Sequence, residues 1–467
     1  MKEVRGSLSV FLALSVTLML SFCMVLIESA RENTLLLKAD ICMDVGVKSL
    51  MAEYHKVLWE DYDLLYVDCS YGTAWPDYDL TKTHLEEYIS KNLDYDNAAW
   101  LRLDYKESKI SQVALASDRE GTDLFWQAAE AAKASVGVPY IEELLTWFKE
   151  FEVTHSAEDN LLVGQQEVRE EIEDVNGTEI EVKEAVWGTD KKGQPILLEE
   201  AEYETVDIDN PLDNILSANV LLRQVLCEEK QISENRVKKE ELASCRRLAS
   251  GTAELERDAY TMWNKAFFCK YAADHFSCFT DSVSDKTQGL CYELEYLIGG
   301  KAADAQNMEL ITAELLAFRE VDNYLNLLQD EAVCLQAHAA ATAAAALLVP
   351  WLEPAIYQAI LIYQAYRESI ADLQMLYAGQ EIPLIKSVPG SIDDEVTLSY
   401  KEYLIMLLMI QGYEKLSMRT MDLLEINVRQ KQQDFCIDAC ISIAMFQAVF
   451  EDAYGKQYII NKKLQYF

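Results

Sequence analysis

The 467-residue sequence has few of the residues that interrupt regular structure, with only 17 Gly and 8 Pro. Average usage of the two together is about 12%, so we expect long, uninterrupted elements and few tight turns. Half of the residues are apolar, which provides enough side chains for sizeable cores and excludes a disordered chain. The composition therefore predicts a helix-rich globular protein.

Positive charge is also scarce. Lys and Arg number 41 against 79 Asp and Glu, which gives a formal net charge of −38. Binding to nucleic acid needs clustered Lys and Arg, so we expect no nucleic-acid partner. The eleven Cys are too dispersed to form the dense framework of a small disulfide scaffold. For Cys436 and Cys440, a disulfide and two free buried thiols are both open.

Motifs that carry chemistry are missing as well. The five His never stand at HxxxH or HExxH spacing, and no CxxC pair exists. We find no phosphate-binding loop, GxSxG elbow or dinucleotide fingerprint. Glu293 and Glu295 are close in sequence, but residues two apart on a helix point to different faces. The sequence therefore predicts no catalytic residue, no bound metal and no cofactor.

One long apolar run is present, from Gly6 to Ile27, and it contains no charged residue. As a helix it reaches roughly the ~30 Å of a bilayer's hydrocarbon layer, so we predict a transmembrane anchor. Lys2 and Arg5 precede it, and the positive-inside rule then places the N-terminus in the cytoplasm and the rest of the chain outside, in a single-pass cell-membrane protein. The residues expected to form the anchor surface are Leu8, Phe11, Leu14, Leu18, Phe22 and Ile27.

Three processing fates compete with a permanent anchor. Cleavage as a secretory signal would need a shorter apolar core and a small residue where Glu28 stands. Lipidation of Cys23 would need a small residue in place of the bulky Phe22. Cleavage after Gly6 would resemble prepilin processing, since a short basic leader ends there. Prepilins usually carry Glu at the fifth mature position, however, and this chain has Phe11.

Apolar residues continue at helical spacing beyond the anchor. The stripe predicts one unbroken helix from about Ser7 to Trp59, apolar all round in its first half and amphipathic in its second. This is the plan of a pilin stalk, although an anchor followed by an ordinary amphipathic helix explains it equally well. The stripe consists of Leu36, Ala39, Met43, Val47, Leu50, Tyr54 and Val57.

Short apolar runs predict strands at Leu64–Val67 and Lys109–Ala116, with helices between and after them. Thirteen acidic residues against four basic ones lie between Glu167 and Glu204, which indicates a solvated, mobile connection. Within it, a helix that stops at Asn176 is favoured over a hairpin there. The three aspartates between Asp207 and Asp213 favour a turn into a helix cap over a calcium loop, because the loop's Gly and Glu are missing.

The pattern from about Leu216 to Gln432 is helical. Two uncharged stretches, 334–352 and 354–366, favour close-packed core helices over a second membrane hairpin, because the first is mostly Ala. At the C-terminus, alternating residues from 457 to 466 predict a strand with one buried face. A turn near Gly455 makes it half of a hairpin, which should pair with the N-terminal strands because two strands alone are marginal in water.

These features predict a helix-rich α+β fold with an inserted helical domain. The expected parts are a cytoplasmic head (1–6), a transmembrane helix (7–27), a stalk helix with an α+β domain (28–163), an acidic connection (164–215), an α-helical domain (216–432) and a C-terminal β-hairpin (433–467) joining the N-terminal sheet.

Several segments also carry a resemblance, among them RGSLSVFLAL, AEYHKVLWEDYDLLYVDCSYG, CYELEYLIGGK, LLAFREVDNYLNLL, YRESIADLQMLYAGQEIPLIK and RTMDLLEINV. The chain resembles an uncharacterised family of membrane-anchored proteins from clostridia and related Gram-positive bacteria. These proteins are typically encoded among tight-adherence (Flp-type) pilus genes, beside minor-pilin-like proteins. The resemblance spans nearly the whole chain and implies a context, with pilus or pseudopilin proteins as partners, but no activity.

Two functions are compatible with these sequence features. The first is a non-catalytic structural or assembly component of a tight-adherence, type IV-like pilus system. The alternative is a cell-envelope hydrolase whose carboxylates converge only in the fold. A cleft that gathers buried carboxylates would favour the enzyme, and a closed helical body with a broad apolar patch would favour partner binding. The sequence does not predict the oligomeric state.

Overall fold

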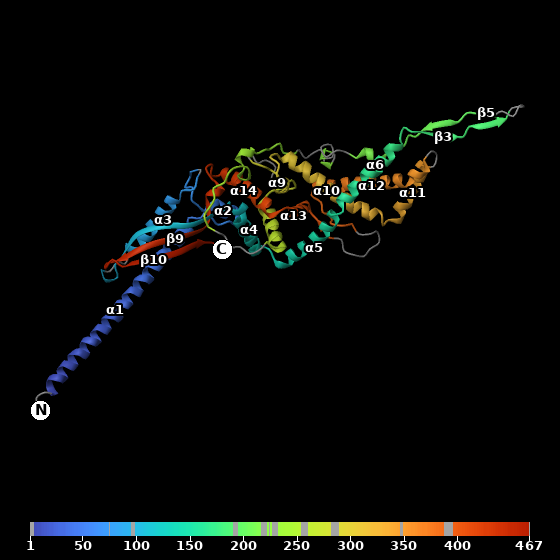
Figure 1. Ribbon diagram of the computed structural model, residues 1–467. Helices are drawn as coiled ribbons and strands as arrows, with labels where there is room; N and C mark the ends of the chain where they lie inside the picture. Colours follow the sequence, from blue (N-terminus) through green and yellow to red (C-terminus); the bar gives the residue numbers. More distant parts are fainter. Residues whose placement is uncertain are drawn as a thin grey trace. The chain divides into compact units, whose positions relative to one another are not determined.

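The computed structural model describes residues 4–73, 75–94, 99–189, 195–215, 222–223, 225–226, 232–253, 260–281, 289–345, 349–386 and 396–466. Helices account for 62% of the described residues and accompany small antiparallel sheets, which confirms the predicted helix-rich α+β class. The chain forms two compact units, labelled by element in Figure 1. Unit 1 comprises Met1–Ala131, Glu240–Tyr260 and Ser417–Phe467, and unit 2 comprises Ala132–Lys239 and Thr261–Leu416. The finer domain boundaries given above stay predictions.

Unit 1 begins with the helix α1 (Val4–Met51), which carries the apolar run and then the amphipathic stretch. The predicted continuation of this helix to Trp59 is wrong, because a separate helix, α2 (Lys56–Tyr62), begins after a break. His55 is the N-cap of α2, and its Nδ1 accepts the backbone N–H of Leu58 at 3.2 Å. A residue that caps a new helix cannot also continue the old one.

The sheet of unit 1 is antiparallel and is centred on β9 (Cys440–Asp452). Its partner in the C-terminal hairpin is β10 (Gln457–Gln465). Two N-terminal strands, β2 (Leu103–Leu115) and the short β1 (Val67–Asp68), also pair with β9. The predicted hairpin and its pairing with both N-terminal strands are therefore confirmed, and the first and last parts of the chain build one sheet.

The second half of α1 and the helix α3 (Tyr78–Asp94) pack on this sheet. Their buried residues, among them Met43 and Ile89, share one apolar cluster with Phe446 and Phe450 of β9. Sequestering that much apolar surface is the main stabilising contribution available to a small sheet. The other elements of unit 1 are η1 (Ala99–Leu101), η2 (Asp118–Gly121), most of α4 (Thr122–Ser135), η4 (Lys239–Glu241), η5 (Ala243–Cys245), most of α14 (Tyr413–Arg429) and η7 (Ile437–Ala439).

Unit 2 is mostly helical. The long helices α10 (Asp304–Leu327) and α12 (Glu353–Tyr377) pack on each other, and α12 also contacts α6 and α11. Its buried Ala and Ile side chains join an apolar cluster with those two helices, so the uncharged stretch 354–366 packs as core helix. The remaining elements are α5 (Val138–His155), α6 (Glu158–Val175), η3 (Pro211–Asn214), α8 (Met262–His275), α9 (Glu293–Gly299), α11 (Glu331–Ala345), η6 (Pro350–Leu352), β7 (Ile382–Pro383), β8 (Thr397–Leu398) and α13 (Tyr400–Ile410).

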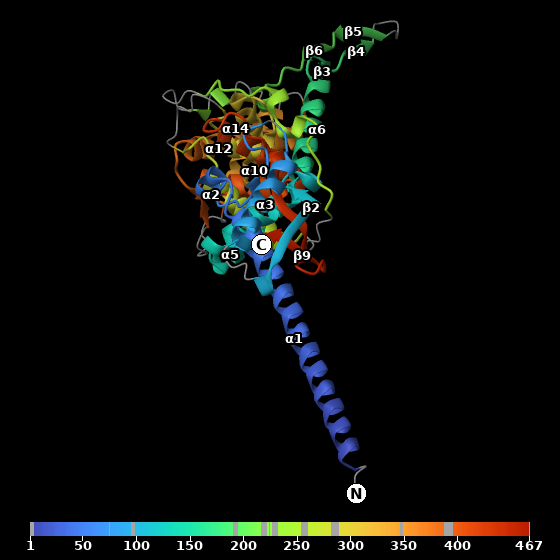
Figure 2. The ribbon, with the colours of Figure 1, turned by 90° about the vertical axis from the view of Figure 1, so that its left-hand side faces the viewer.

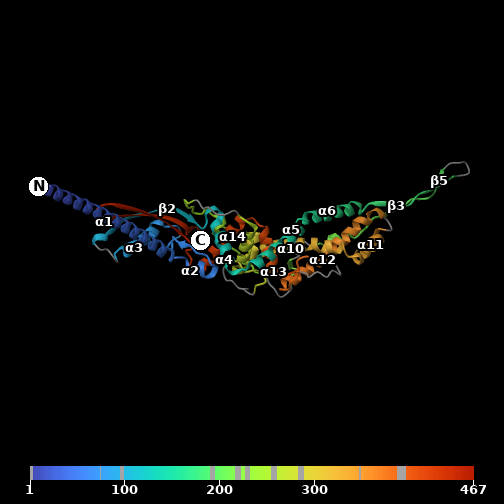
Figure 3. The ribbon, with the colours of Figure 1, turned by 90° about the horizontal axis from the view of Figure 1, so that it is seen from below.

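The acidic stretch before residue 215 is more ordered than predicted. The helix α6 ends at Val175 with Asn176 as its C-cap, which confirms the favoured helix. Two antiparallel ladders follow, β3 (Glu179–Lys183) with β6 (Glu202–Thr205) and β4 (Val186–Thr189) with β5 (Pro195–Glu199). We call residues 179–189 and 195–205 the arm, and Figure 3 shows it continuing from the end of α6. These ladders were not predicted, because charge density hid the alternation of apolar and acidic residues, and the mobility expected of this stretch stays a prediction.

The predicted helical pattern from Leu216 onward fails over residues 232–253. The described part of this segment contains only the 3₁₀ turns η4 and η5, and residues 216–221 lie outside the description. Its backbone groups bond elsewhere: Thr252 N–H and Ala253 N–H both donate to Val113 O of β2, at 2.6 and 2.8 Å. A segment whose N–H groups bond to a strand cannot also form helix hydrogen bonds.

Candidate functional site

The first half of α1 is the candidate membrane anchor, and Figure 2 shows it as a single straight continuation of the helix. The six residues predicted for the anchor surface are all between 49% and 70% exposed, and no other described element covers them. Thr17 Oγ1 donates to Ala13 O at 2.8 Å and Ser21 Oγ donates to Thr17 O at 2.6 Å, so these hydroxyls are satisfied within the helix. The length and composition of α1 are sufficient for a membrane span. A signal sequence near the N-terminus has the same properties.

The second half of α1 is buried against the sheet, but along a slightly different stripe from the predicted one. Leu36 is 46% exposed, and Leu35 takes the buried position. Ala39, Met43 and Leu50 are fully buried as expected. The anchor is thus continuous with a core element of unit 1, so its orientation fixes that of the sheet.

Charged residues stand directly after the apolar run and bind the hairpin turn of the sheet. Arg31 Nη2 lies 2.9 Å from Asp452 Oδ2 and 2.7 Å from Glu28 Oε1. The Arg31 and Asp452 side chains are 2% and 0% exposed. The Arg31 guanidinium also lies over the ring of Tyr454, 4.4 Å from its centroid. We call Arg31, Asp452, Glu28 and Tyr454 the clamp.

The clamp is built on the turn between β9 and β10. Asp452 Oδ1 accepts the backbone N–H groups of Tyr454 and Lys456, both at 2.9 Å, and Gly455 supplies the left-handed residue at φ 81°. Burial by itself would raise the pKa of Asp452, but the Lys456 N–H and the Arg31 guanidinium hold that pKa below its usual range. The hydrogen bond from Arg31 likewise lowers the pKa of Glu28. The clamp carboxylates are therefore charged at neutral pH.

A second buried ionic network in unit 1 ties the segment around Arg246 to α14 and η7. Arg246 Nη2 lies 2.8 Å from both Glu425 Oε2 of α14 and Asp438 Oδ1. Asp438 also accepts the backbone N–H of Ala249 at 2.9 Å. Glu425 pairs further with Arg429. Sequence analysis missed this network, although Glu425 lies in one of the motifs that carry the family resemblance.

Unit 2 contains a comparable network around Arg319, whose side chain is fully buried. Its Nε and Nη2 donate to Asp372 Oδ2 at 3.0 and 2.9 Å, and its Nη2 lies 3.0 Å from Asp322 Oδ2. Its Nη1 donates to the backbone oxygens of Pro383 and Leu384, each at 3.0 Å. The guanidinium thereby joins α10 and α12 to the end of β7 and to the residue after it. Two of the quoted motifs, LLAFREVDNYLNLL and YRESIADLQMLYAGQEIPLIK, meet at this residue, which suits a structural role for them.

Glu295 in α9 is a strongly perturbed carboxyl of unit 2. It is fully buried, and its Oε1 accepts Phe279 N–H at 2.8 Å and Tyr400 O–H at 2.9 Å. Burial raises its pKa to about 7, and the nearby Asp304 adds to that shift. Through Oε1 it joins Phe279 to Tyr400 of α13, a contact within the buried core of unit 2.

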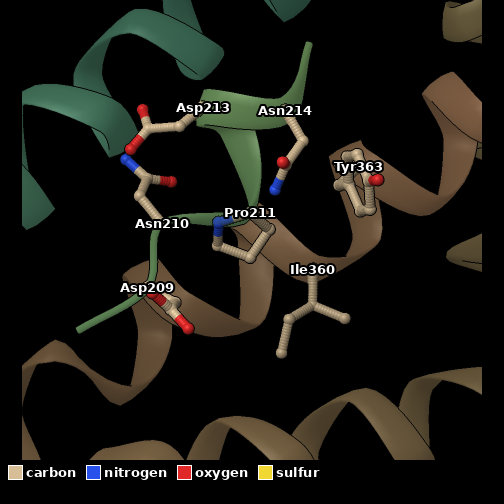
Figure 4. Close-up of a pocket in the computed structure, with 7 residues that line it drawn as sticks. All are labelled: Asp209, Asn210, Pro211, Asp213, Asn214, Ile360 and Tyr363. Carbon is tan, nitrogen blue, oxygen red and sulfur yellow. The ribbon is translucent and has the colours of Figure 1, made fainter.

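A pocket of about 580 Å³ lies beside η3 in unit 2 and is lined by Asp209, Asn210, Pro211, Asp213, Asn214, Ile360 and Tyr363 (Figure 4). Asn210 caps η3, since its side chain accepts the N–H of Leu212 at 3.0 Å, which confirms the predicted turn into a helix cap. The Asp213 side chain is 63% exposed, with Arg169 Nε at 3.9 Å. These carboxylates are open to water, so the pocket lacks the buried pair that would favour an enzyme.

The residue types that bind metals are dispersed in the described structure. Among the described residues, no group of three or more His, Cys, Asp and Glu could hold a metal ion. Cys436 and Cys440 are free, buried thiols, so the alternative of a disulfide between them is wrong. Burial raises the pKa values of both thiols, which makes them poor nucleophiles.

The comparisons with known proteins place the chain in a family without naming an activity. A family model described as "Family of unknown function (DUF5702)" matches residues 201–452, more than half of the chain. No curated protein and no solved structure matches.

Proposed function

We propose that this chain, which belongs to the DUF5702 family of unknown function, is a membrane-anchored structural or assembly component of a tight-adherence pilus system. The observation that carries the proposal is the construction of α1. Its first half is apolar and uncovered, and one face of its second half is buried against the antiparallel sheet of unit 1. This combination is the plan of a pilin, in which one helix both anchors and supports the head.

In this proposal the anchor residues from Leu8 to Ile27 lie in the hydrocarbon layer, where a helix satisfies its own backbone. Glu28 then marks the membrane surface, because it is the first charged residue after the run. At that point the clamp joins α1 to the β9–β10 turn, and the apolar core of unit 1 holds the rest of the sheet on α1. Any displacement of the anchor along its axis would therefore move the whole sheet.

The proposed orientation puts the N-terminus in the cytoplasm and the chain beyond the anchor outside, since Lys2 and Arg5 flank the anchor on its short side. Other pilus or pseudopilin proteins would be its partners. Cleavage after Gly6 would release the anchor for entry into a filament, whereas an intact leader would keep the chain in the membrane platform. The mass of the N-terminal peptide from purified membranes distinguishes these two fates.

The competing proposal is a cell-envelope hydrolase. It would need carboxylates that are shielded from bulk water and still reach a substrate. The shielded carboxylate Glu295 accepts hydrogen bonds from Phe279 and Tyr400 within the core, and Asp213 in the pocket is largely exposed. The described geometry therefore favours the structural role.

Protease mapping tests the proposed topology. Protease added to intact, wall-stripped cells should degrade the chain beyond about Glu28 and leave an N-terminal fragment that contains the anchor. A chain that stays full-length on intact cells, and is cut only after lysis, would contradict the orientation. A protected fragment around residues 334–366 would show a second insertion.

A further inference from the structure

The arm of unit 2 exposes apolar side chains that nothing in the described structure covers. Trp187 and Leu198 are each 64% exposed, and Tyr203 is 59% exposed. Every described residue of β6 is exposed, and the other described elements scarcely contact either ladder. Two-stranded ladders without a covering layer are marginal in water, so the arm lacks the third strand or layer that usually stabilises such a structure.

Strand pairing in the arm also leaves main-chain groups available. Both ladders are two-stranded, with Trp187 opposite Leu197 in one and Glu181 opposite Tyr203 in the other. Each strand therefore has one edge without a partner strand, which is the usual template for adding a strand from another chain.

The charge of the arm determines which kind of partner can bind it. Seven of its eight described charged residues are Glu, and the remaining one, Lys183, lies 3.1 Å from Glu202. Like charges would repel a second copy of the arm, and an anionic lipid surface would be repelled as well. The acids concentrate near Glu179 to Glu184 and Glu199 to Glu204, whereas Trp187 and Leu198 occupy the distal ladder. Within β3 and β6 the glutamates alternate with Ile180, Val182 and Tyr203, so a complementary added strand alternates basic and apolar residues.

We infer that the arm is a docking strand pair for an extended polypeptide segment of another protein, in which apolar residues alternate with Lys or Arg. The segment adds to a free edge of the arm by main-chain hydrogen bonds. Its apolar side chains cover Trp187 and Leu198, and its cationic side chains pair with the glutamates of β3 and β6. This inference does not depend on the pilus proposal, because any extracytoplasmic or cytoplasmic partner of that chemistry satisfies it.

The test uses the full-length chain in detergent micelles and two fluorescent peptides of about eight residues, the length of one strand. One peptide alternates Val with Lys, and the other has Glu in place of every Lys. Fluorescence anisotropy should show binding of the Lys peptide that weakens with salt, and no comparable binding of the Glu peptide. Binding of both peptides alike, or of neither, would overturn the inference.

Variants of the arm then locate the binding. Val206 N–H donates to Thr178 O at 2.9 Å, so the two ends of the arm already meet and a short Gly-Gly turn can replace residues 179–205. This deletion should abolish binding of the Lys peptide, and the double change Trp187→Ala and Leu198→Ala should weaken it at least about tenfold. Val153→Ala removes an apolar side chain that is 72% exposed in α5 and is the matched control, for which no change is expected.

A charge reversal separates specific docking from general attraction to an acidic protein. Glu181→Lys together with Glu204→Lys should shift preference from the Lys peptide to the Glu peptide, while circular dichroism shows an unchanged helix content. Unchanged binding after arm deletion or charge reversal would overturn the inference. Arm-dependent dimerisation in sedimentation, or arm-dependent binding to phosphatidylglycerol vesicles, would assign a different occupant and would also overturn it.

Discussion

Arg31 and Asp452 stand 421 positions apart in the chain and form a buried ion pair, with Arg31 Nη2 2.9 Å from Asp452 Oδ2. The pair joins the residue that follows the apolar half of α1 to the turn of the C-terminal hairpin. It therefore joins the first and last parts of unit 1 near the anchor. In sequence, the whole of unit 2 lies between these two residues.

Asp452→Asn should destabilise unit 1, because it leaves Arg31 buried with a neutral partner. We expect hydrogen exchange of the β9–β10 amides to accelerate and the unfolding temperature of unit 1 to fall by several degrees. The matched control is Glu32→Gln, which removes the solvent-exposed partner of Lys456 at 2.6 Å and should change little. Equal effects of the two substitutions would show that the clamp contributes no more than a surface pair.

The clamp should also set an acid limit for unit 1. The folded-state pKa of Asp452 lies below its usual value, so the unfolded chain takes up the proton first as pH falls. The stabilisation is present above about pH 3.9, the ordinary Asp value, and is lost as pH falls through the folded pKa. An Asp452→Asn protein should therefore approach wild-type stability only in strong acid.

Glu295 should make the stability of unit 2 depend on pH in the direction opposite to that of Asp452, and Glu295→Gln should remove this dependence. The pKa of Glu295 is raised to about 7, so the folded chain binds a proton that the unfolded chain releases near pH 4.5. Wild-type stability then falls as pH rises between these values, by about 1.4 kcal/mol per pH unit for a single group. Gln keeps the acceptor for Phe279 N–H and Tyr400 O–H, so the variant should lose that slope and be more stable at pH 8. Urea unfolding from pH 4.5 to 8 measures this slope, and Glu143→Gln, at an exposed position of α5, is the control. If the stability of wild type and of Glu295→Gln changes with pH in parallel, the raised pKa of Glu295 is contradicted.

Arg319→Ala should destabilise unit 2 by about 3–5 kcal/mol, the usual cost of leaving buried charges without their partner. Asp322 and Asp372 both lose the guanidinium, and the backbone oxygens of Pro383 and Leu384 lose their donor. Urea unfolding followed by circular dichroism measures the change. Arg367→Ala is the control on the exposed face of α12. A loss below about 1 kcal/mol, the range of surface pairs, would show that the network is energetically neutral.

Deleting residues 439–467 tests the shared sheet. The deletion removes β10 and the central strand β9, so β1 and β2 lose their common partner. The remaining part of unit 1 should become sensitive to protease while unit 2 stays folded. If residues 28–131 resist protease as well as in the full-length chain, the sheet is not what stabilises unit 1.

The sequence allowed the sheet to be predicted because its strands carry local signals. Tyr458, Ile460 and Leu464 alternate with polar residues, and a lone hairpin needs further partners. The end of α1 was mispredicted because apolar spacing continues through Val57, whereas the break depends on the capping geometry of His55. Helix periodicity reports which face is buried and not where the backbone changes direction.

The candidate site was predictable only in its anchor. A run of uncharged residues is a local property, so the exposed surface of α1 followed directly from it. The clamp could not be predicted, since no periodicity relates Arg31 to a residue 421 positions away. Buried Arg319 likewise looked like one more charged residue on a helix, and only the tertiary fold brings Asp372 and the Pro383 carbonyl to it.

Counting surface pili on cells that lack this chain tests the central claim most directly. If the chain is an anchored component of a tight-adherence pilus system, its deletion should reduce pilus number or length and adhesion. Wild type should restore both, and a chain with Leu14→Asp and Leu18→Asp in the anchor should not, whereas Leu335→Asp, at a 74% exposed position of α11, should restore them. Normal pilus number, length and adhesion in the deletion strain would contradict the claim.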